Sequence, residues 1–184
     1  MTEIDKTIVP TKLLWVDLEM TGLDAQNDVI LEVAAIVTDF DFKVLDKYEA
    51  VIWQSDEALE RGNEWAKQQH ASSGLLERVR MAGRPESDVT HELAAFVNAH
   101  FGDEPAILAG NSIHNDRIFI KRWWPEVEDL LHYRMLDVSS LKIIMQAKYG
   151  VPFEKTEDHR ALGDIEASIA ELKFYLKWLR GGSA

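Results

Sequence analysis

The run Leu13-Leu14-Trp15-Val16-Asp17-Leu18-Glu19 joins a strand-forming apolar segment to two acids, and it decides how the rest of the chain is interpreted. Thr21-Gly22 follows directly, which is typical of a strand that ends in a turn. Side chains two positions apart on a strand project from the same face, with their Cα atoms roughly 6.6 Å apart. Asp17 and Glu19 are therefore predicted to project together from the end of a mostly apolar strand.

After this strand, the sequence first favours more strands and then alternates strands with helices. Residues 29–38 (VILEVAAIVT) are rich in β-branched side chains, and residues 43–53 alternate apolar with polar ones. Short connections predict that these three strands form an antiparallel meander. Residues 106–109 and 133–138 are shorter strand candidates between helical patterns. This order predicts an α/β fold: a mixed five-stranded sheet, with three antiparallel strands and then strand–helix alternation, flanked by helices.

Four helices are predicted from apolar periodicity and from the residues at their ends. Ser87 is a candidate N-cap for the first helix, and Pro125 is expected to stop a second helix over residues 114–124. Ser139-Ser140 would start a third helix that ends at Gly150. The last helix has the clearest apolar stripe, whose members recur at helical spacing: Ile165, Ile169, Leu172, Leu176 and Leu179.

Length, composition and charge limit the class of protein. A chain of 184 residues predicts one domain over residues 1–184, with an ordered core over residues 12–179 between frayed ends. The absence of cysteine excludes disulfide frameworks, thiolate zinc sites and cysteine nucleophiles, and we expect a cytoplasmic protein. A net charge of −12 argues against long duplex DNA as a partner, because many basic side chains would be needed to bind it. No apolar stretch reaches about 18 residues, so no membrane span is predicted.

Two further polar clusters carry candidate functional residues. In residues 110–117 (GNSIHNDR), Asp116 falls in the first turn of a predicted helix. In residues 159–164 (HRALGD), His159 and Asp164 would diverge by about 140° on a continuous helix. Both can serve one site only if His159 lies on the preceding loop or in a frayed first turn. Each cluster alone has an ordinary explanation, such as an acid that stabilises a helix dipole or a surface histidine.

Taken together, the clusters favour a metal site. Carboxylates that meet in one cleft repel one another, by about 1 kcal/mol per pair at 4 Å in water and about 4 kcal/mol at an effective dielectric constant of 20. Such a group is tolerable only with cations, and all-oxygen ligands favour Mg²⁺ or Mn²⁺. Two such ions can activate water and stabilise a leaving oxygen. The hypothesis that follows from the residues is phosphodiester hydrolysis.

Four runs of the sequence resemble the oligoribonuclease family, within the exonuclease superfamily named for an Asp-Glu-Asp-Asp-His catalytic set. These runs are WVDLEMTGLD (15–24), GNSIHNDRIF (110–119), YRMLDVSSLK (133–142) and HRALGDIEASIAEL (159–172). The resemblance extends from Lys12 to Leu179 and implies a ribonuclease H-like fold. One departure is Gly163, where an acid is expected beside the last ligand, but the catalytic pattern itself is intact.

The resemblance implies a role for each matched position. The ligands of two divalent cations, Mg²⁺ or Mn²⁺, would be Asp17, Glu19, Asp116 and Asp164. His159 would be the general base that deprotonates the attacking water. Substrate contacts would come from Leu18 as a hydrophobic wedge, Trp65 and His70 at the bases, Ser112, Arg134 and Ser139 at the 5′ phosphate, and Tyr133 of a second copy. The implied protein is a homodimeric 3′→5′ exoribonuclease that releases 5′-mononucleotides from short RNA, above all from dinucleotides.

Two alternatives remain open at this point. An exonuclease of the same superfamily that acts on longer substrates, such as a proofreading or tRNA-trimming enzyme, would carry the same metal ligands. A catalytically silent oligonucleotide-binding protein of the same fold would have no use for His159, which speaks against it. Rates on dinucleotides and on longer RNA separate the first alternative, and tight binding without product would indicate the second.

Overall fold

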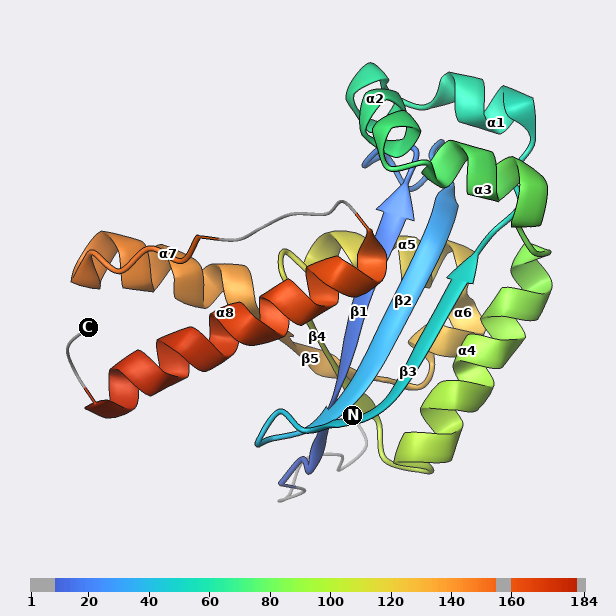
Figure 1. Cartoon of the computed structure of the whole chain (residues 1–184). Coiled ribbons are helices and arrows are strands. Elements are labelled where there is room, and N and C mark those ends of the chain that lie inside the picture. The colour runs from blue at the N-terminus through green and yellow to red at the C-terminus, as the bar shows by residue number, and fades with distance from the viewer. Residues whose placement is uncertain (1–8, 155–159, 182–184) are drawn as a thin grey trace.

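The computed structural model describes residues 9–154 and 160–181, which form a sheet with helices on both faces (Figure 1). The strands are β1 (Lys12–Met20), β2 (Ile30–Asp39), β3 (Val44–Val51), β4 (Ala106–Gly110) and β5 (Leu131–Asp137). The helices are α1 (Asp56–Arg61), α2 (Glu64–Ser72), α3 (Leu75–Ala82), α4 (Glu86–Phe101), α5 (His114–Trp123), α6 (Pro125–Glu128), α7 (Val138–Tyr149) and α8 (Ala161–Gly181).

The sheet of the described residues has five strands in the order β3-β2-β1-β4-β5. β2 is antiparallel to both β1 and β3, whereas β4 is parallel to both β1 and β5. This topology confirms the predicted mixed sheet, with its antiparallel meander and subsequent strand–helix alternation. β1 is the central strand, so its C-terminal acids lie at the middle of one end of the sheet.

Alternate residues of β1 face two different helical layers. One face of the strand packs with α4, α5 and α6 and includes Leu14, Val16 and Leu18. The opposite face packs with α8 and includes Leu13 and Trp15. Figure 1 shows α8 crossing this second face. Because side chains alternate along a strand, Asp17 and Glu19 lie on the same side of the sheet as Trp15 and α8.

α8 is the longest helix in the described part of the chain, at 21 residues. Ile165, Ile169 and Leu172 are buried against the sheet, as the apolar stripe predicts. Leu179 is 48% exposed, because the C-terminal part of the helix extends past the sheet beside α7 (Figure 1). None of the described helices combines the length and apolarity needed to span a lipid bilayer.

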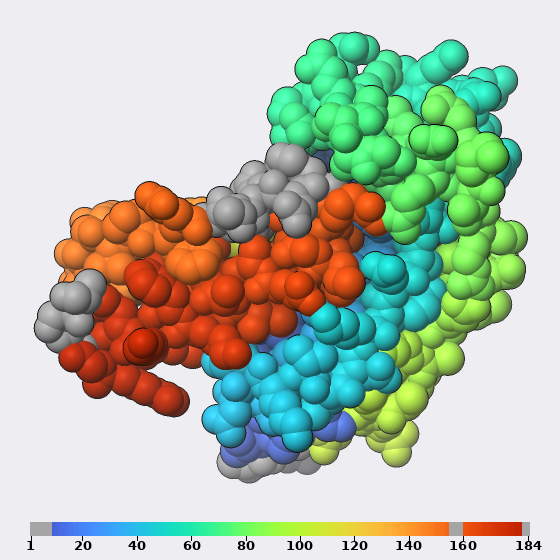
Figure 2. Space-filling view, in the orientation of Figure 1, coloured from blue at the N-terminus to red at the C-terminus, as the bar shows by residue number. Residues whose placement is uncertain are grey.

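Three short helices, α1 to α3, form a block beyond the C-terminal end of β1 (Figure 1), visible as the teal and green upper part of Figure 2. The side chains of Ser55 and Asn63 cap α1 and α2 by accepting backbone hydrogen bonds. A separate apolar cluster attaches the block to β2 and β3, with Leu31, Leu75 and Val79 fully buried. These helices were not predicted from the sequence, because segments of six to nine residues show too few turns for a clear period.

Two helix boundaries differ from those predicted. α4 begins at Glu86 with Pro85 in the N-cap position, so Ser87 lies inside the first turn and is not the cap. Pro125 ends α5 as expected, but it also starts the short α6, because proline suits the first turn of a helix. Gly150 ends α7 in a left-handed conformation, with φ of 66°, as predicted.

Candidate active site

Three of the four predicted metal ligands meet at the C-terminal end of β1. Asp17 and Glu19 project from the strand, and Asp164 lies in the first turn of α8, which crosses that face. One carboxylate oxygen of each residue lies within 4.8 Å of those of the other two. The structure thus brings together acids that are more than 140 residues apart in the sequence, at the spacing that a bound cation requires.

Asp116 approaches the same place from the other side of β1. It lies in the first turn of α5, is 6% exposed, and its Oδ1 accepts a hydrogen bond of 2.9 Å from the backbone N–H of Leu18. Among the described residues, the group of carboxylates within 4.8 Å of one another does not include it. Burial raises the pKa of Asp116 to about 7, and its charge in turn raises the pKa of Glu19. Asp116 is therefore a neighbour of the cluster, with its carboxyl group turned toward the β1 backbone.

The electrostatics of the cluster fit a site for divalent cations. The pKa of Glu19 rises from 4.5 to about 7, first because of burial and then because of Asp164, Glu32 and Asp116, while Arg160 lowers it. An acid with a raised pKa in such surroundings lacks compensating positive charge. The donors are all carboxylate oxygens, which are the ligands that Mg²⁺ and Mn²⁺ prefer.

Glu32 is a further acid at this site, and no motif in the sequence assigns it a role. It lies on β2 opposite Glu19, and its side chain is 3% exposed. Arg160 binds both of its carboxylate oxygens, at 3.1 and 2.7 Å, and Arg78 of α3 binds one at 3.1 Å. The backbone N–H of Ala161 donates to it at 3.4 Å. Glu32 thus connects β2 to α3 and to the start of α8, the helix that carries Asp164.

Replacing Glu32 with Gln is expected to lower the free energy of unfolding by about 2 kcal/mol. The substitution leaves Arg160 and Arg78 without their anionic partner, and the loss is moderate because both arginines are partly exposed. Urea-induced unfolding measures it, with Glu49→Gln on the exposed side of β3 as the control. Equal stabilities of the two variants would show that the pairs around Glu32 do not hold the start of α8.

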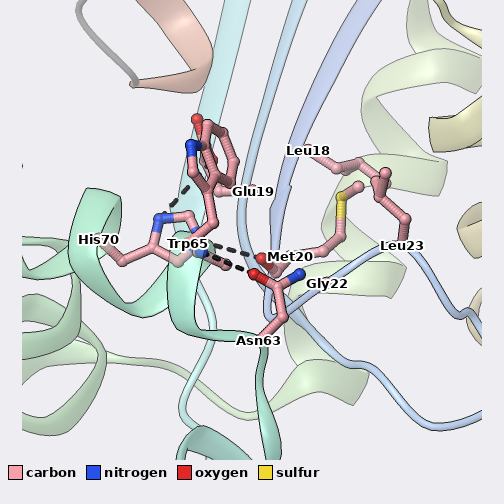
Figure 3. Close-up of a pocket in the computed structure, with 9 residues that line it drawn as sticks. Leu18, Glu19, Met20, Gly22, Leu23, Asn63, Trp65 and His70 are labelled. Carbon is pink, nitrogen blue, oxygen red and sulfur yellow. Dashed lines mark hydrogen bonds and ion pairs between the residues drawn. The ribbon is translucent and has the colours of Figure 1, made fainter.

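A pocket of about 580 Å³ opens beside the carboxylates, between the end of β1 and α2 (Figure 3). Its lining is mostly apolar and comprises Leu18, Glu19, Met20, Gly22, Leu23, Asn63, Trp65, Ala66 and His70. Trp65 is 63% exposed at the opening, an unusual position for a large aromatic side chain. Glu19 belongs both to this pocket and to the carboxylate cluster, so a ligand in the pocket would lie next to the predicted metal ligands.

His70 forms part of the wall of this pocket and is almost completely buried, at 3% exposure. Its Nε2 lies 2.9 Å from the backbone oxygen of Met20, and its Nδ1 lies 3.7 Å from Oε2 of Glu19 (Figure 3). The imidazole therefore links α2 to the end of β1. In this position it could restrict the movement of Glu19 as well as contact a ligand.

The predicted serines lie in a second polar cluster, where β4 and β5 end. Oγ of Ser112 lies 3.1 Å from Oγ of Ser139, and the backbone N–H of Ser112 donates to Ser139 and to Asp137 at 2.9 and 3.0 Å. Asp137 also caps α7 by accepting from the backbone N–H of Ser139 at 2.9 Å, so α7 begins at Val138 and not at the predicted Ser139-Ser140. Ser112 has a φ of 50°, a left-handed conformation that is costly for a non-glycine residue.

The remaining predicted residues are placed less centrally. Tyr133 and Arg134 lie on the exposed edge strand β5, where the guanidinium of Arg134 is 5.0 Å from the ring centre of Tyr133. Tyr133 is 60% exposed, so its ring is open to contact with another molecule. His159, the predicted general base, lies outside the described residues, one peptide bond before Arg160.

Comparison with known proteins agrees with this geometry. The family profile RNase_T, described as "Exonuclease", matches residues 14–172. The oligoribonuclease of Francisella tularensis subsp. tularensis (strain WY96-3418) is 42% identical over 165 residues, covering 89% of this chain and 93% of its own length. The oligoribonuclease of Shewanella amazonensis is 41% identical over 167 residues, covering 89% of this chain and 92% of its own.

Among solved structures, the chain is similar to exonuclease I of E. coli in complex with single-stranded DNA. The TM-score is 0.69 at 17% identity, and the match covers 93% of this chain. It spans only 41% of the exonuclease I chain. At this identity the similarity supports the fold alone, and it agrees with the predicted ribonuclease H-like architecture.

Proposed function

The chain belongs to the oligoribonuclease family of exonucleases, and from this we propose that it is a metal-dependent 3′→5′ exoribonuclease that converts short oligoribonucleotides, above all dinucleotides, to 5′-mononucleotides. The observation that carries the proposal is the convergence of Asp17, Glu19 and Asp164 beside a pocket that exposes a tryptophan. A binding protein has no need for a cluster of carboxylates next to its ligand, or for a glutamate, Glu19, whose pKa is raised to about 7 by burial and neighbouring acids. We also propose that residues 1–184 form a single exonuclease domain.

The described acids would hold two divalent cations, Mg²⁺ or Mn²⁺. Asp17, Glu19 and Asp164 would be direct ligands, and Asp116, which is bonded to the backbone of β1, would complete the set. Bound ions would supply a Lewis acid that favours ionisation of the attacking water and stabilises the charge on the leaving oxygen. His159 would accept the proton of that water, and the ion pair of Arg160 with Glu32 holds the next residue of the chain in place.

The pocket would accept the bases of the substrate. Trp65 offers an exposed aromatic face. Leu18 lines the same pocket but is only 5% exposed, so it would act as the wedge through the part of its side chain that borders the pocket. Aromatic stacking does not depend on sequence, which suits an enzyme that degrades RNA fragments of any sequence. The net charge of −12 also favours short substrates, because a dinucleotide offers few phosphates and needs no broad basic groove.

The other end of the substrate would meet the second polar cluster. Ser112, Ser139 and Arg134 would bind a 5′ phosphate, and the Tyr133 of a second copy would cover it.

Exposed apolar side chains on β5 and α7, including Ile143 at 66% exposure, support a homodimer. Light scattering is expected to give the mass of a dimer, and a fully active monomer would contradict this. The cysteine-free sequence suits a reducing compartment and supports a cytoplasmic location.

Replacing Trp65 with Ala is expected to raise the KM for a dinucleotide about tenfold and to change kcat much less. Stacking on an aromatic side chain contributes roughly 1–3 kcal/mol per base, and Trp65 is not among the proposed metal ligands. Steady-state kinetics measure both constants. Trp53→Ala is the matched control, since Trp53 is similarly exposed, at 55%, but does not line the pocket. An unchanged KM in the Trp65 variant would exclude the pocket as the site of base binding.

A length series of RNA tests the proposed activity itself. We expect the rate to be highest on the dinucleotide, to fall steeply on longer RNA, and to vanish with a chelator. Equal or faster cleavage of the longer RNA would favour an exonuclease that acts on long substrates. Tight binding without any product, even with added Mn²⁺, would instead indicate a silent binding protein.

A further inference from the structure

Glu171 is a buried acid of α8 that the proposed reaction does not use. It is 0% exposed, and its two carboxylate oxygens have different partners. Oε1 accepts a hydrogen bond of 2.9 Å from the hydroxyl group of Tyr175 and lies 3.8 Å from Nζ of Lys142. Oε2 accepts a hydrogen bond of 3.1 Å from Nδ2 of Asn111, the residue that follows β4. Burying a charged group costs free energy unless the group is paired and hydrogen-bonded, so the partners of Glu171 are what stabilise it in this position.

The hydrogen bonds of Asn111 have a defined direction. The hydroxyl group of Ser168 donates to the backbone oxygen of Asp164 at 2.7 Å, so its oxygen can only accept from Nδ2 of Asn111, 2.9 Å away. Glu171 accepts the second N–H of the same amide. Two acceptors therefore hold the Asn111 amide in one orientation, with its Oδ1 turned toward Ser139.

This orientation of the Asn111 amide determines which hydroxyl group, that of Ser112 or that of Ser139, has a proton to donate to a bound anion. Ser139 donates its only hydroxyl proton to Oδ1 of Asn111, at 3.2 Å. Its oxygen then accepts from the backbone N–H and the hydroxyl group of Ser112. The proton of Ser112 is thus the one that can turn away from the pair and donate to an incoming anion.

We propose that Glu171 is a positioning residue for the 5′-phosphate subsite, acting through Asn111 to keep Ser139 as an acceptor and Ser112 as the phosphate donor. This inference rests on the proposed function, because Ser112 and Ser139 are assigned there to the 5′ phosphate. Glu171 itself touches no substrate. It is separated from the serines by the Asn111 amide, which transmits the direction of the hydrogen bonds.

A glutamine at position 171 would disturb this direction with little change in shape. The ammonium group of Lys142 can only donate and favours an oxygen at the position of Oε1, to which the hydroxyl group of Tyr175 can continue to donate. The amide nitrogen of the glutamine would then face Nδ2 of Asn111, and two donors would oppose each other. A half-turn of the Asn111 amide would relieve this conflict. It would, however, place Oδ1 of Asn111 against Oγ of Ser168, whose proton is already donated to the backbone oxygen of Asp164.

The test compares one dinucleotide with and without a 5′ phosphate. For wild-type protein, kcat/KM is expected to be higher with the phosphate. Glu171→Gln is expected to lower kcat/KM about tenfold on the phosphorylated dinucleotide, mainly through KM, and to change it less than about twofold on the other. Tyr175→Phe is the matched control, because it removes the hydrogen bond to Oε1 of the same carboxylate and leaves the Asn111 side intact. Tyr175→Phe is expected to keep the wild-type preference for the phosphorylated dinucleotide.

Two further variants keep the inference falsifiable if Glu171→Gln does not fold, as judged by circular dichroism. Asn111→Ala removes the connecting amide and is expected to reduce the phosphate preference by a similar factor. In a Ser139→Ala background, Glu171→Gln or Asn111→Ala is expected to have no further effect on the preference, because the connection is already broken.

The outcomes distinguish failure of the inference from failure of the proposed function. Suppose that wild-type protein prefers the phosphorylated dinucleotide and that Glu171→Gln and Asn111→Ala both keep this preference. This result would overturn the role of Glu171 and leave the proposed function intact. Equal losses on both dinucleotides would also overturn it, since they would indicate general damage. Wild-type protein that hydrolyses both dinucleotides equally would remove the assignment of the serines to a 5′ phosphate, and the role of Glu171 with it.

Discussion

Replacing Asp164 with Asn is expected to lower kcat on a dinucleotide by about 1,000-fold or more in the presence of Mg²⁺. Asp164 is one of three acids whose oxygens lie within 4.8 Å of one another, and loss of its charge removes a ligand from the proposed cations. Loss of a single group that stabilises transition-state charge already costs roughly 100- to 1,000-fold in kcat. Glu166→Gln is the matched control, because Glu166 lies on the same helix but is 54% exposed and pairs with Lys47.

The same variant is expected to be more stable than wild-type protein when both are free of metal. Removing one of several mutually repelling carboxylates is expected to raise the free energy of unfolding by about 1 kcal/mol or more. Added Mn²⁺ is expected to stabilise wild-type protein strongly and the variant weakly, because a ligand of the folded state stabilises it in proportion to its affinity. A variant that is inactive and also destabilised without metal would indicate that Asp164 serves the fold and not a cation.

The stability of the metal-free protein is expected to fall between pH 5 and pH 8, because of Glu19. Its pKa is about 7 in the folded protein and 4.5 when unperturbed, so the folded state binds more protons than the unfolded state across this interval. Stability therefore decreases as the pH rises through the interval, and the contribution of Glu19 amounts to about 3 kcal/mol. Asp116, whose pKa is also about 7, changes stability in the same direction.

Comparison with Glu19→Gln isolates this contribution from those of all other acids. In a chelator, the variant is expected to be about 3 kcal/mol more stable than wild-type protein at pH 8 and of similar stability at pH 4, below the unperturbed pKa of Glu19. Urea unfolding at both pH values measures the difference. Parallel stability profiles would show that Glu19 has an ordinary pKa and that the acids are not close enough to need a cation.

Most of the sheet could be predicted from the sequence because its signals are local. The β-branched run at residues 29–38 becomes β2, and the short connections on either side place it between β1 and β3. The helices α1 to α3 could not be predicted in this way. Each is a short segment that depends on the apolar cluster around Leu31 and Leu75, which the folded chain assembles.

The cluster of carboxylates at the end of β1 could be predicted in part. The spacing of Asp17 and Glu19 places them on one face of a strand. That Asp116 and Asp164 join them is a hypothesis from the residues, which the resemblance to a family strengthens, because no local spacing relates the three segments. The detail that Asp116 is turned toward the backbone N–H of Leu18 depends on a contact between residues 98 positions apart. No local pattern contains that information.

Glu32 and Glu171 were missed, although the sequence carries a signal for each. Glu32 interrupts the apolar run of β2, and Glu171 directly precedes Leu172 in the apolar stripe of α8. An acid in a buried segment needs a partner, so these positions could have been marked as special. Their partners could not be named, because Arg160 is 128 positions from Glu32 and Asn111 is 60 positions from Glu171.

The cation site is tested most directly by soaking crystals of the protein in Mn²⁺ and locating the ions by their anomalous scattering. We expect anomalous peaks at the end of β1, within coordination distance of the carboxylates of Asp17, Glu19 and Asp164, and with Asp116 beside them. Peaks elsewhere, or none at these carboxylates under conditions in which the protein hydrolyses a dinucleotide, would contradict the assignment of this cluster as the metal site.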